Sequence, residues 1–374
     1  MEKWLRGWGK ASRFGLILFA SALAAQTPVW KGKIFKEGDA TVIQNPKEPI
    51  YKGNILSLKE ELSIGGASAE EYSILAEIDS LAVDEEGTIY ALDTKDICVK
   101  VYDRSGKFLR TIGRKGRGPG EFTNPYKIVI DGKNQYLVVH EPGIGFVVFD
   151  FEGKFIKNIH NADFKSVHKV LFDSNGNIIF NRIKIQDTEH RWDELKKYGP
   201  NLKLLAEIKS IPIGSPYDVV QPMVTWDLDG DGNIVFGFPS RYEIEIINNQ
   251  NKAIRRIRKE SDLVELSKEE KERIAQIIKK QIMPADLAAK LFTSKYHSAF
   301  ADINIASDRR IFVTTWKKSG KNNISDVFDK NGRFLAEVVL PSQRIFFAQG
   351  RLYTIEEDVD GYPVIKRYAM TWKQ

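Results

Sequence analysis

The chain has 374 residues, 42% of them hydrophobic, and its 56 lysines and arginines against 50 aspartates and glutamates give a formal charge of +6. This length can bury a sizeable core, and the single cysteine, Cys98, excludes an internal disulfide. Four basic residues and one acidic residue lie within residues 1–25. The remaining chain is therefore only weakly basic, which argues against nucleic acid as a partner.

Residues 1–25 predict a secretory signal peptide. Four basic residues precede the apolar run of residues 14–23, which ends in Ala22-Leu23-Ala24. The run is about half of the roughly 20 residues that a membrane-spanning helix needs. We therefore expect cleavage near Ala24, export to the periplasm or the extracellular space, and no transmembrane segment after cleavage.

Residues 26–374 predict a single domain built from a repeated unit. Each unit has a first turn and a second turn in fixed register: Asp84 precedes Asp103 by 19 residues, and Asp131 precedes Asp150 by the same distance. Alternating apolar residues predict four strands in each unit. A recurrence at fixed spacing is typical of a repeat architecture. The six first turns are expected at Asp84, Asp131, Asp173, Asp229, Asp308 and Gln349-Gly350.

Two units are longer than the others. In the third unit, residues 181–201 predict a long polar loop in place of a short hairpin. After the fourth unit, residues 262–298 predict a helical insert that begins at a capping box of Ser267 and Glu270 and ends at Pro284. Its apolar stripe favours packing on the rest of the domain, with a lid or a docking surface for another protein as the alternatives.

These features predict an all-β fold: a six-bladed β-propeller of four-stranded antiparallel blades, with the helical insert between blades 4 and 5. A two-sheet sandwich is the alternative, but it gives no reason for two turns to recur in register. The last unit shows only three strands. We expect a strand from residues 39–60, either "ATVIQ" or "NILSL", to complete it and close the ring.

The segment "IGRKGRGPGEFTNP" and the repeated "D-x-x-G" turns resemble bacterial six-bladed β-propeller proteins related to NHL repeats. The resemblance covers nearly all of the mature chain and implies a binding or scaffold protein. Some proteins of this kind, a lyase and lactonase relatives, hold a divalent metal in the central channel. The alternative is therefore a metal-dependent hydrolase or lyase with its site at the mouth of that channel. The five histidines do not recur at equivalent repeat positions, which argues against a three-histidine metal centre.

In a propeller, the hairpins between second and third strands lie on one face, where functional residues gather on loops. The predicted hairpins of this chain are rich in arginine and aromatic residues, which suit carboxylates, sugars and peptides. We therefore expect a peptide, sugar or protein ligand; a solvated loop surface is the alternative for each residue. The candidate ligand-binding residues are His140, Arg182, Arg191, Trp192, Arg241, Tyr242, Trp316 and Lys317.

A weak metal candidate lies in the segment "DLDGDGN". Asp227, Asp229 and Asp231 match the first half of a calcium-binding loop, but Val235 and Phe238 occupy positions where ligands are needed. An ordinary turn explains the same residues. Calcium is thus a possible cofactor only on this incomplete ligand set, and no other cofactor is expected.

Overall fold

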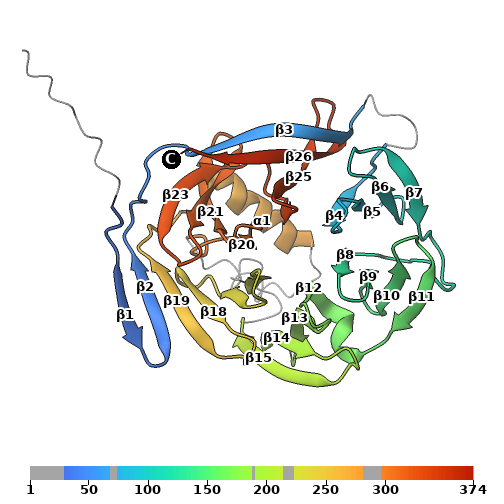
Figure 1. The fold of residues 1–374 in the computed structure, drawn as a ribbon, viewed down its shortest axis with the longest axis horizontal. Coiled ribbons are helices and arrows are strands. Elements are labelled where there is room, and N and C mark those ends of the chain that lie inside the picture. Colours follow the sequence, from blue (N-terminus) through green and yellow to red (C-terminus); the bar gives the residue numbers. More distant parts are fainter. Residues whose placement is uncertain (1–28, 68–73, 188–189, 214–222, 281–295, 374) are drawn as a thin grey trace, which may run out of the picture.

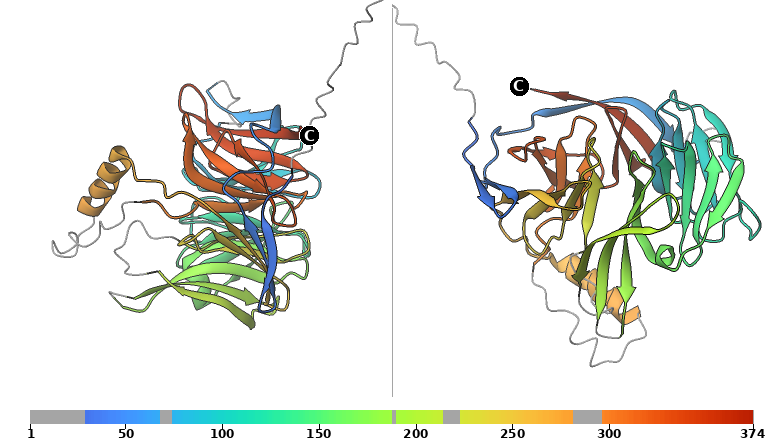
Figure 2. Two further views of the ribbon diagram at one scale, coloured as in Figure 1. Left: turned by 90° about the vertical axis from the view of Figure 1, so that its left-hand side faces the viewer. Right: turned by 60° about the horizontal axis from the view of Figure 1, so that its bottom comes forward.

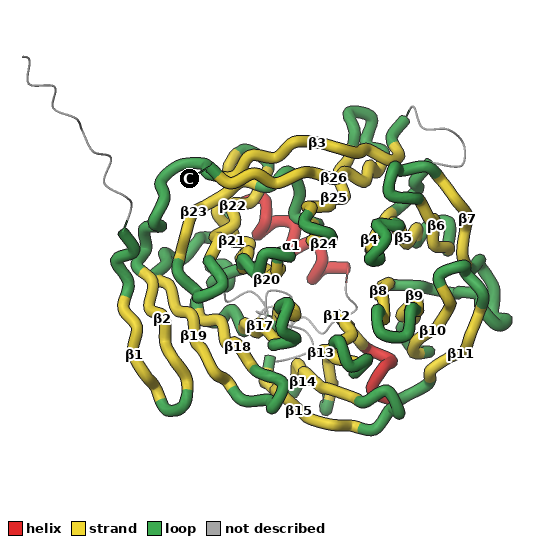
Figure 3. The backbone as a smooth tube through the Cα atoms, viewed as in Figure 1, coloured by secondary structure: helices red, strands yellow, loops and turns green. Residues whose placement is uncertain are grey.

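The computed structural model describes residues 29–67, 74–187, 190–213, 223–280 and 296–373. They form six β-sheets around a central opening (Figure 1), which confirms an all-β, six-bladed propeller with four-stranded antiparallel blades. Strands and loops make up nearly all of the described chain (Figure 3). The signal-peptide prediction lies outside the described residues.

Blades 1 to 3 are consecutive along the chain, and each runs from the central opening to the periphery (Figure 1). Blade 1 contains β4 (Ile78–Val83), β5 (Ile89–Asp93), β6 (Cys98–Tyr102) and β7 (Phe108–Ile112). Blade 2 contains β8 (Lys127–Asp131), β9 (Tyr136–Glu141), β10 (Gly145–Asp150) and β11 (Phe155–Ile159). The short 3-10 helix η2 (Ala162–Ser166) leads to blade 3, which contains β12 (Val167–Phe172), β13 (Ile178–Ile185), β14 (Arg191–Tyr198) and β15 (Leu204–Pro212).

The second half of the ring has the same order. Blade 4 contains β16 (Thr225–Leu228), β17 (Ile234–Gly237), β18 (Glu243–Ile247) and β19 (Ala253–Lys259). Blade 5 contains β20 (Asp302–Ile305), β21 (Ile311–Ser319), β22 (Asn322–Phe328) and β23 (Phe334–Val339). Blade 6 contains β24 (Ile345–Ala348), β25 (Arg351–Glu357), β26 (Pro363–Trp372) and, from the start of the chain, β3 (Leu56–Gly65).

The N-terminal segment closes the ring and also extends blade 4. The strand β3, which includes most of "NILSL", pairs antiparallel with β26. The other candidate, "ATVIQ", does not close the ring: it forms β2 (Ala40–Asn45), which pairs in parallel with β19, and β1 (Lys33–Glu37) adds a sixth strand to that sheet. The buried side chain of Asn45 also joins β2 to blade 5, because it donates to Gly332 O at 2.9 Å and accepts from Phe334 N at 2.8 Å.

The recurring aspartates are turn residues. Asp84 Oδ1 accepts hydrogen bonds from the backbone N–H groups of Glu86 and Thr88, and Gly87 has a positive φ of 88° that glycine adopts without strain. In blade 5 the equivalent of Asp84 is Ala306, which makes the same backbone pair with Arg310. The predicted turn at Asp308 is thus displaced by two residues.

The core is divided into six apolar clusters, one between each pair of neighbouring blades. Middle strands such as β5 and β6 are buried along their whole length, because both faces of each blade pack on a neighbour. Outer strands such as β7 alternate with solvent. Cys98 lies in this buried layer, where burial raises the pKa of its thiol to about 11.

The predicted long loop of the third unit is wrong. Residues 181–201 mostly belong to β13 and β14, which pair as far as Ile185 with Arg191 and make a long hairpin. Some of the polar residues that suggested a loop meet across these strands: Arg182 Nε, for example, donates to Glu194 Oε2 at 3.0 Å. Cross-strand pairs of opposite charge stabilise paired strands.

One α-helix, α1 (Lys268–Lys280), follows β19 and precedes β20 along the described chain. The predicted capping box is confirmed, since Ser267 N donates to Glu270 Oε2 at 2.9 Å and Glu270 N donates to Ser267 Oγ at 3.1 Å. Figure 2 shows α1 standing away from the sheets on one face of the ring. Leu266 before the helix is buried, whereas Leu263 is 66% exposed.

Candidate functional site

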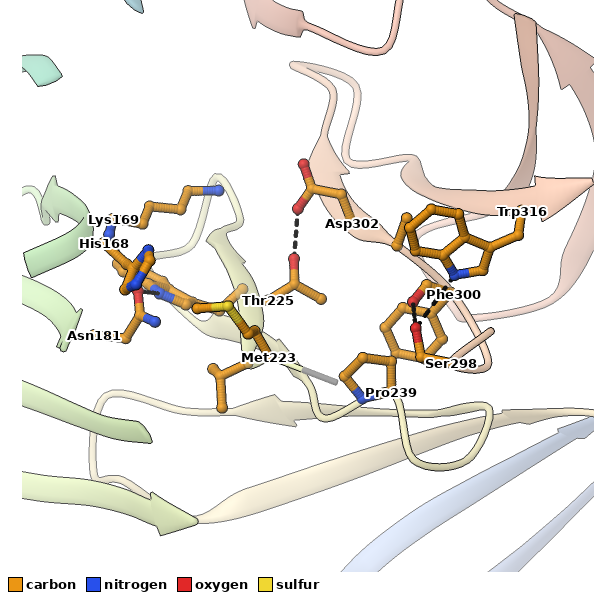
Figure 4. Close-up of a pocket in the computed structure, with 13 residues that line it drawn as sticks. His168, Lys169, Asn181, Met223, Thr225, Pro239, Ser298, Phe300, Asp302 and Trp316 are labelled. Atoms are coloured by element: carbon orange, nitrogen blue, oxygen red, sulfur yellow. Dashed lines mark hydrogen bonds between the residues drawn. The ribbon is translucent and has the colours of Figure 1, made fainter. Parts of the chain in front are cut away.

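A cavity of about 300 Å³ lies at the innermost strands of blades 3, 4 and 5, which surround the central opening (Figure 1). Its walls come from blades 3, 4 and 5 and from the segment that returns from the helical insert (Figure 4). The lining residues that matter below are His168, Lys169, Met223, Thr225, Asp302 and Trp316. A second cavity, of about 340 Å³, lies between blades 4 and 5 at the opposite ends of the strands and is lined by turn residues such as Asp231 and Lys330.

The innermost strands of three blades supply the charged and hydroxyl groups of the cavity. Lys169 in β12 and Thr225 in β16 each precede their first-turn aspartate by four residues, and Asp302 in β20 precedes Ala306 by four. Innermost strands line the central opening (Figure 1), so one repeat position carries these side chains to the same place. The propeller geometry therefore gathers residues that are far apart in sequence.

Two opposite charges face each other in this cavity. Figure 4 shows Lys169 and Asp302 pointing toward one another from opposite walls, above Thr225. Lys169 Nζ lies 3.8 Å from Asp227 Oδ1 and 5.7 Å from the centre of the Trp226 ring. Asp302 Oδ1 accepts hydrogen bonds from the Thr225 hydroxyl and, at 2.8 Å, from its neighbouring backbone N–H. Within the described residues no ion pair joins Lys169 to Asp302.

Two further basic groups, His168 and Lys127, interact electrostatically with the surroundings of Lys169. Burial lowers the pKa of His168, and the charges of Lys127 and Arg191 lower it further. The ring of His168 is thus neutral at pH 7 and offers one nitrogen donor and one acceptor. Lys127 lies on the innermost strand of blade 2. Burial lowers the pKa of its ammonium group, the charge of Lys169 lowers this pKa further, and the charge of Asp302 raises it.

A buried hydrogen-bond chain holds the floor of the cavity in place. Trp226 Nε1 donates to Asn181 Oδ1 at 3.0 Å, and Asn181 Nδ2 donates to Asp193 Oδ1 at 2.9 Å. Asp193 Oδ2 accepts from the backbone N–H of Val224 at 3.0 Å. Burial raises the pKa of Asp193 to about 6, because its partners are neutral donors that only partly replace water. These contacts join blades 3 and 4 under the cavity.

The helical insert is attached at the edge of the same cavity. His297 stacks on Trp316 with ring centres 4.3 Å apart, and its Nε2 lies 3.1 Å from Glu270 Oε2 in the first turn of α1. Trp316 Nε1 donates to Ser298 Oγ at 3.2 Å. The base of α1 is thus fixed to blade 5 through the tryptophan that lines the cavity.

Two of the predicted ligand-binding residues are buried inside the blades. His140 is fully buried, with Nε2 2.9 Å from Phe164 O, and burial lowers its pKa. Tyr242 donates from its hydroxyl to Asp326 Oδ2 at 2.5 Å, and Lys259 Nζ lies 2.8 Å from the same oxygen. Both side chains therefore serve the core rather than an exposed face.

Three of the arginine and lysine candidates, Arg182, Arg241 and Lys317, lie in ion pairs. Arg182 contacts Asp163 and Glu194, each at 2.9 Å, in a network on blade 3. Arg241 is largely exposed and lies 2.6 Å from Glu243, and Lys317 lies 2.7 Å from Glu337. Arg191 and Trp192 begin β14 and are half-buried. Trp316 is the predicted residue that lines the cavity.

The three aspartates of the predicted calcium loop point to different partners. Asp227 Oδ2 accepts from Ile305 N at 2.8 Å, and Asp229 Oδ1 makes the same turn contacts as Asp84. Asp231 makes two contacts with Arg309, at 2.7 and 2.8 Å. In the part of the chain that the structure describes, no group of three or more His, Cys, Asp or Glu residues is placed to hold a metal.

Sequence reasoning did not find Lys169, Thr225 and Asp302. The candidate residues were chosen from the predicted hairpins, whereas these three residues belong to the innermost strands. A signal was nonetheless present: counting four residues back from the first turns at Asp131, Asp173 and Asp229 gives Lys127, Lys169 and Thr225, all of them polar. An apolar residue is the usual choice in a buried strand, so polar residues at this position indicated the channel.

The fold and this cavity define the class of protein: a six-bladed β-propeller with a candidate ligand site at its channel mouth. A model of the family DUF5128, described as a 6-bladed beta-propeller, matches residues 70–296, and the chain belongs to this family. No curated protein matches the chain. In the described residues, no helix has the length and apolar character needed to cross a membrane.

Two solved structures from Bacteroides are similar in fold. A protein of Bacteroides fragilis that is thought to be exported aligns with 89% of this chain and 100% of its own, at 12% identity and a TM-score of 0.59. A member of the DUF4221 family from Bacteroides vulgatus aligns with 86% of this chain and 100% of its own, at 14% identity and a TM-score of 0.53. At these identities the similarity concerns the fold alone.

Proposed function

We propose that this protein is an exported, non-enzymatic binding propeller that recognises a small ligand in the channel-mouth cavity. The observation that carries this proposal is the cavity itself, which brings Lys169, Asp302 and Trp316 together from two different blades. A concave site with a few convergent polar groups on a rigid scaffold is the usual form of a ligand pocket. The buried contacts of Asp193 and Asn181 fix its floor before any ligand arrives.

Export is supported by the N-terminal pattern of basic residues followed by an apolar run, and by the similar protein of Bacteroides fragilis that is thought to be exported. The compartment is the periplasm or the extracellular space.

The repeat motifs support a relation to NHL propellers, and the order of the elements supports an insert between blades 4 and 5. Its attachment at Trp316 supports a role beside the cavity.

The predicted ligand classes were a peptide, a sugar or a protein, and a cavity of this size favours a small molecule or a chain end over a broad protein surface. Of the predicted binding residues we retain Trp316. The alternative, a metal-dependent hydrolase or lyase, has no observation in its favour within the described residues, where Asp227, Asp229 and Asp231 hold separate partners.

A thermal-shift screen with an occluding variant tests this proposal. Met223 lines the cavity and is 36% exposed, so Met223→Trp fills the opening at low cost to the core. Ile254 lines the second cavity and is 40% exposed, so Ile254→Trp is the matched control. A ligand at 100 times its Kd should stabilise the wild type and the control by about 2.7 kcal/mol, but not Met223→Trp. Equal shifts in all three proteins would place the ligand elsewhere.

A further inference from the structure

The charges of the cavity are separated by wall. Blade 3 contributes the ammonium group of Lys169, and blade 5 contributes the carboxylate of Asp302 (Figure 4). The hydrogen bonds that Asp302 accepts come from a hydroxyl, an amide and a backbone N–H group, which orient the carboxylate but bring no positive charge. Lys169 has one long ion contact, 3.8 Å from Asp227, within the described residues. Each wall therefore presents a charge that close protein contacts leave largely uncompensated.

An apolar surface adjoins these two charges. Trp316, Phe300, Pro239 and Met223 line the cavity, and Figure 4 shows Trp316, Phe300 and Pro239 on the side of Asp302 and below it. Stacking on His297 at 4.3 Å and the hydrogen bond to Ser298 hold Trp316 in one orientation. The cavity thus combines a cation, an anion and a fixed aromatic wall in about 300 Å³.

We propose that the ligand is a small zwitterion with an apolar side chain, the chemistry of a free α-amino acid or of a very short peptide. Its carboxylate lies beside Lys169 and the neutral ring of His168, its ammonium group beside Asp302, and its side chain against Trp316. This inference rests on the proposed binding function and names the ligand class for the same cavity.

Other ligand classes satisfy only part of this arrangement. A simple anion placed beside Lys169 would also meet the carboxylate of Asp302, and a simple cation beside Asp302 would meet Lys169. Repulsion between the ligand and the like charge on the facing wall weakens binding, because little water screens charges in a partly dehydrated cavity. A neutral sugar would leave both charges without a counter-charge while removing water from them. A zwitterion compensates both walls at once.

Calorimetric titration with three related compounds tests the inference on the wild-type protein. L-phenylalanine carries both charges, L-phenylalaninamide lacks the carboxylate, and N-acetyl-L-phenylalanine lacks the ammonium group. We expect L-phenylalanine to bind at least about tenfold more tightly than either derivative, because loss of one charged hydrogen bond exceeds about 1.4 kcal/mol. Phenylalanylglycine in a parallel titration distinguishes a free amino acid from a short peptide as the source of the zwitterion.

Two substitutions assign each charge to its partner. Lys169→Met should remove the preference for L-phenylalanine over its amide while keeping the preference over the N-acetyl compound. Asp302→Asn, which keeps the oxygen that accepts from Thr225, should do the reverse. Lys330→Met, in the second cavity, is the matched control and should keep both preferences. A protein that is only destabilised would lose both preferences together.

Wild-type protein that binds all three compounds equally, or binds none of them, overturns the zwitterion assignment. The proposed function fails separately. If another ligand class binds and Met223→Trp abolishes that binding, the cavity remains the binding site and only the ligand class is wrong. If no binding responds to Met223→Trp, the cavity is not the binding site and both proposals fall.

Discussion

Two pairs of opposite charge lie near blades 4 and 5, and they differ in how they are completed. Lys259 and Asp326 are almost fully buried. Lys259 Nζ lies 2.8 Å from Asp326 Oδ2, and this oxygen also accepts a hydrogen bond from Tyr242. Lys169 and Asp302 face each other across an open cavity, and no ion pair joins them within the described residues. In the first pair each charge is buried directly against the other. The second pair leaves charge facing solvent.

The difference teaches where to look for function in this fold. Burying Lys259 and Asp326 costs desolvation free energy, which their mutual contact and the hydrogen bond from Tyr242 offset, so the pair constrains how blades 4 and 5 fit together. Burial raises the pKa of Tyr242 well above its usual range, and the charge of Asp326, to which its hydroxyl donates, raises this pKa further. Lys169 and Asp302 contribute no such constraint, which leaves them available to a ligand.

Breaking the buried pair of Lys259 and Asp326 should have the largest effect on stability. Lys259→Met leaves the carboxylate of Asp326 buried without its cation, and we expect the free energy of unfolding to fall by about 3–5 kcal/mol. Urea unfolding at pH 7 measures this loss. Lys317→Met is the control, since Lys317 forms a 2.7 Å ion pair that is about one-third exposed, and exposed pairs are worth about 1 kcal/mol or less. A similar loss in both variants would contradict the comparison.

Asp193 is an intermediate case: a buried carboxylate whose hydrogen bonds come from an amide and a backbone N–H. Its pKa is raised from 3.8 to about 6. The stability that this group contributes is complete below about pH 4 and is lost as the pH rises through about 6. The stability of the wild type relative to Asp193→Asn should therefore fall by about 3 kcal/mol between about pH 4 and pH 7.

Unfolding curves of both proteins across this pH range give the difference directly. The asparagine does not titrate, so background changes from acids elsewhere cancel in the subtraction. A difference that is constant with pH would show that the Asp193 carboxyl titrates near its ordinary value.

Features of the sequence that depend on near neighbours were predicted correctly. Asp84 and Gly87 close their turn within five residues, and Ser267 and Glu270 cap α1 within four. Side-chain and backbone partners of this kind are fixed by spacing alone, so the repeat and the start of the helix could be read from the chain.

Features that depend on pairing between distant segments were not predictable in the same way. The strand β2 pairs in parallel with β19, more than 200 residues later. The long hairpin of β13 and β14 was interpreted as a loop because its charges find their partners only across the strands. The cavity needed a further step, since Lys169 and Asp302 meet only when blades 3 and 5 are placed around one axis.

Removing one charge of Lys169 and Asp302, which face each other across the cavity, should have the smallest effect on stability. Lys169→Met loses one long contact to Asp227, whose carboxylate keeps its hydrogen bonds from two backbone N–H groups. We expect the free energy of unfolding to fall by less than the roughly 3–5 kcal/mol expected for Lys259→Met, because the lost contact is long and Asp227 keeps both backbone hydrogen bonds. Urea unfolding beside Lys259→Met measures the contrast between the two lysines. A loss for Lys169→Met as large as that for Lys259→Met would mean that Lys169 already has its counter-charge within the folded protein, and the channel mouth would then be a structural feature rather than a binding site.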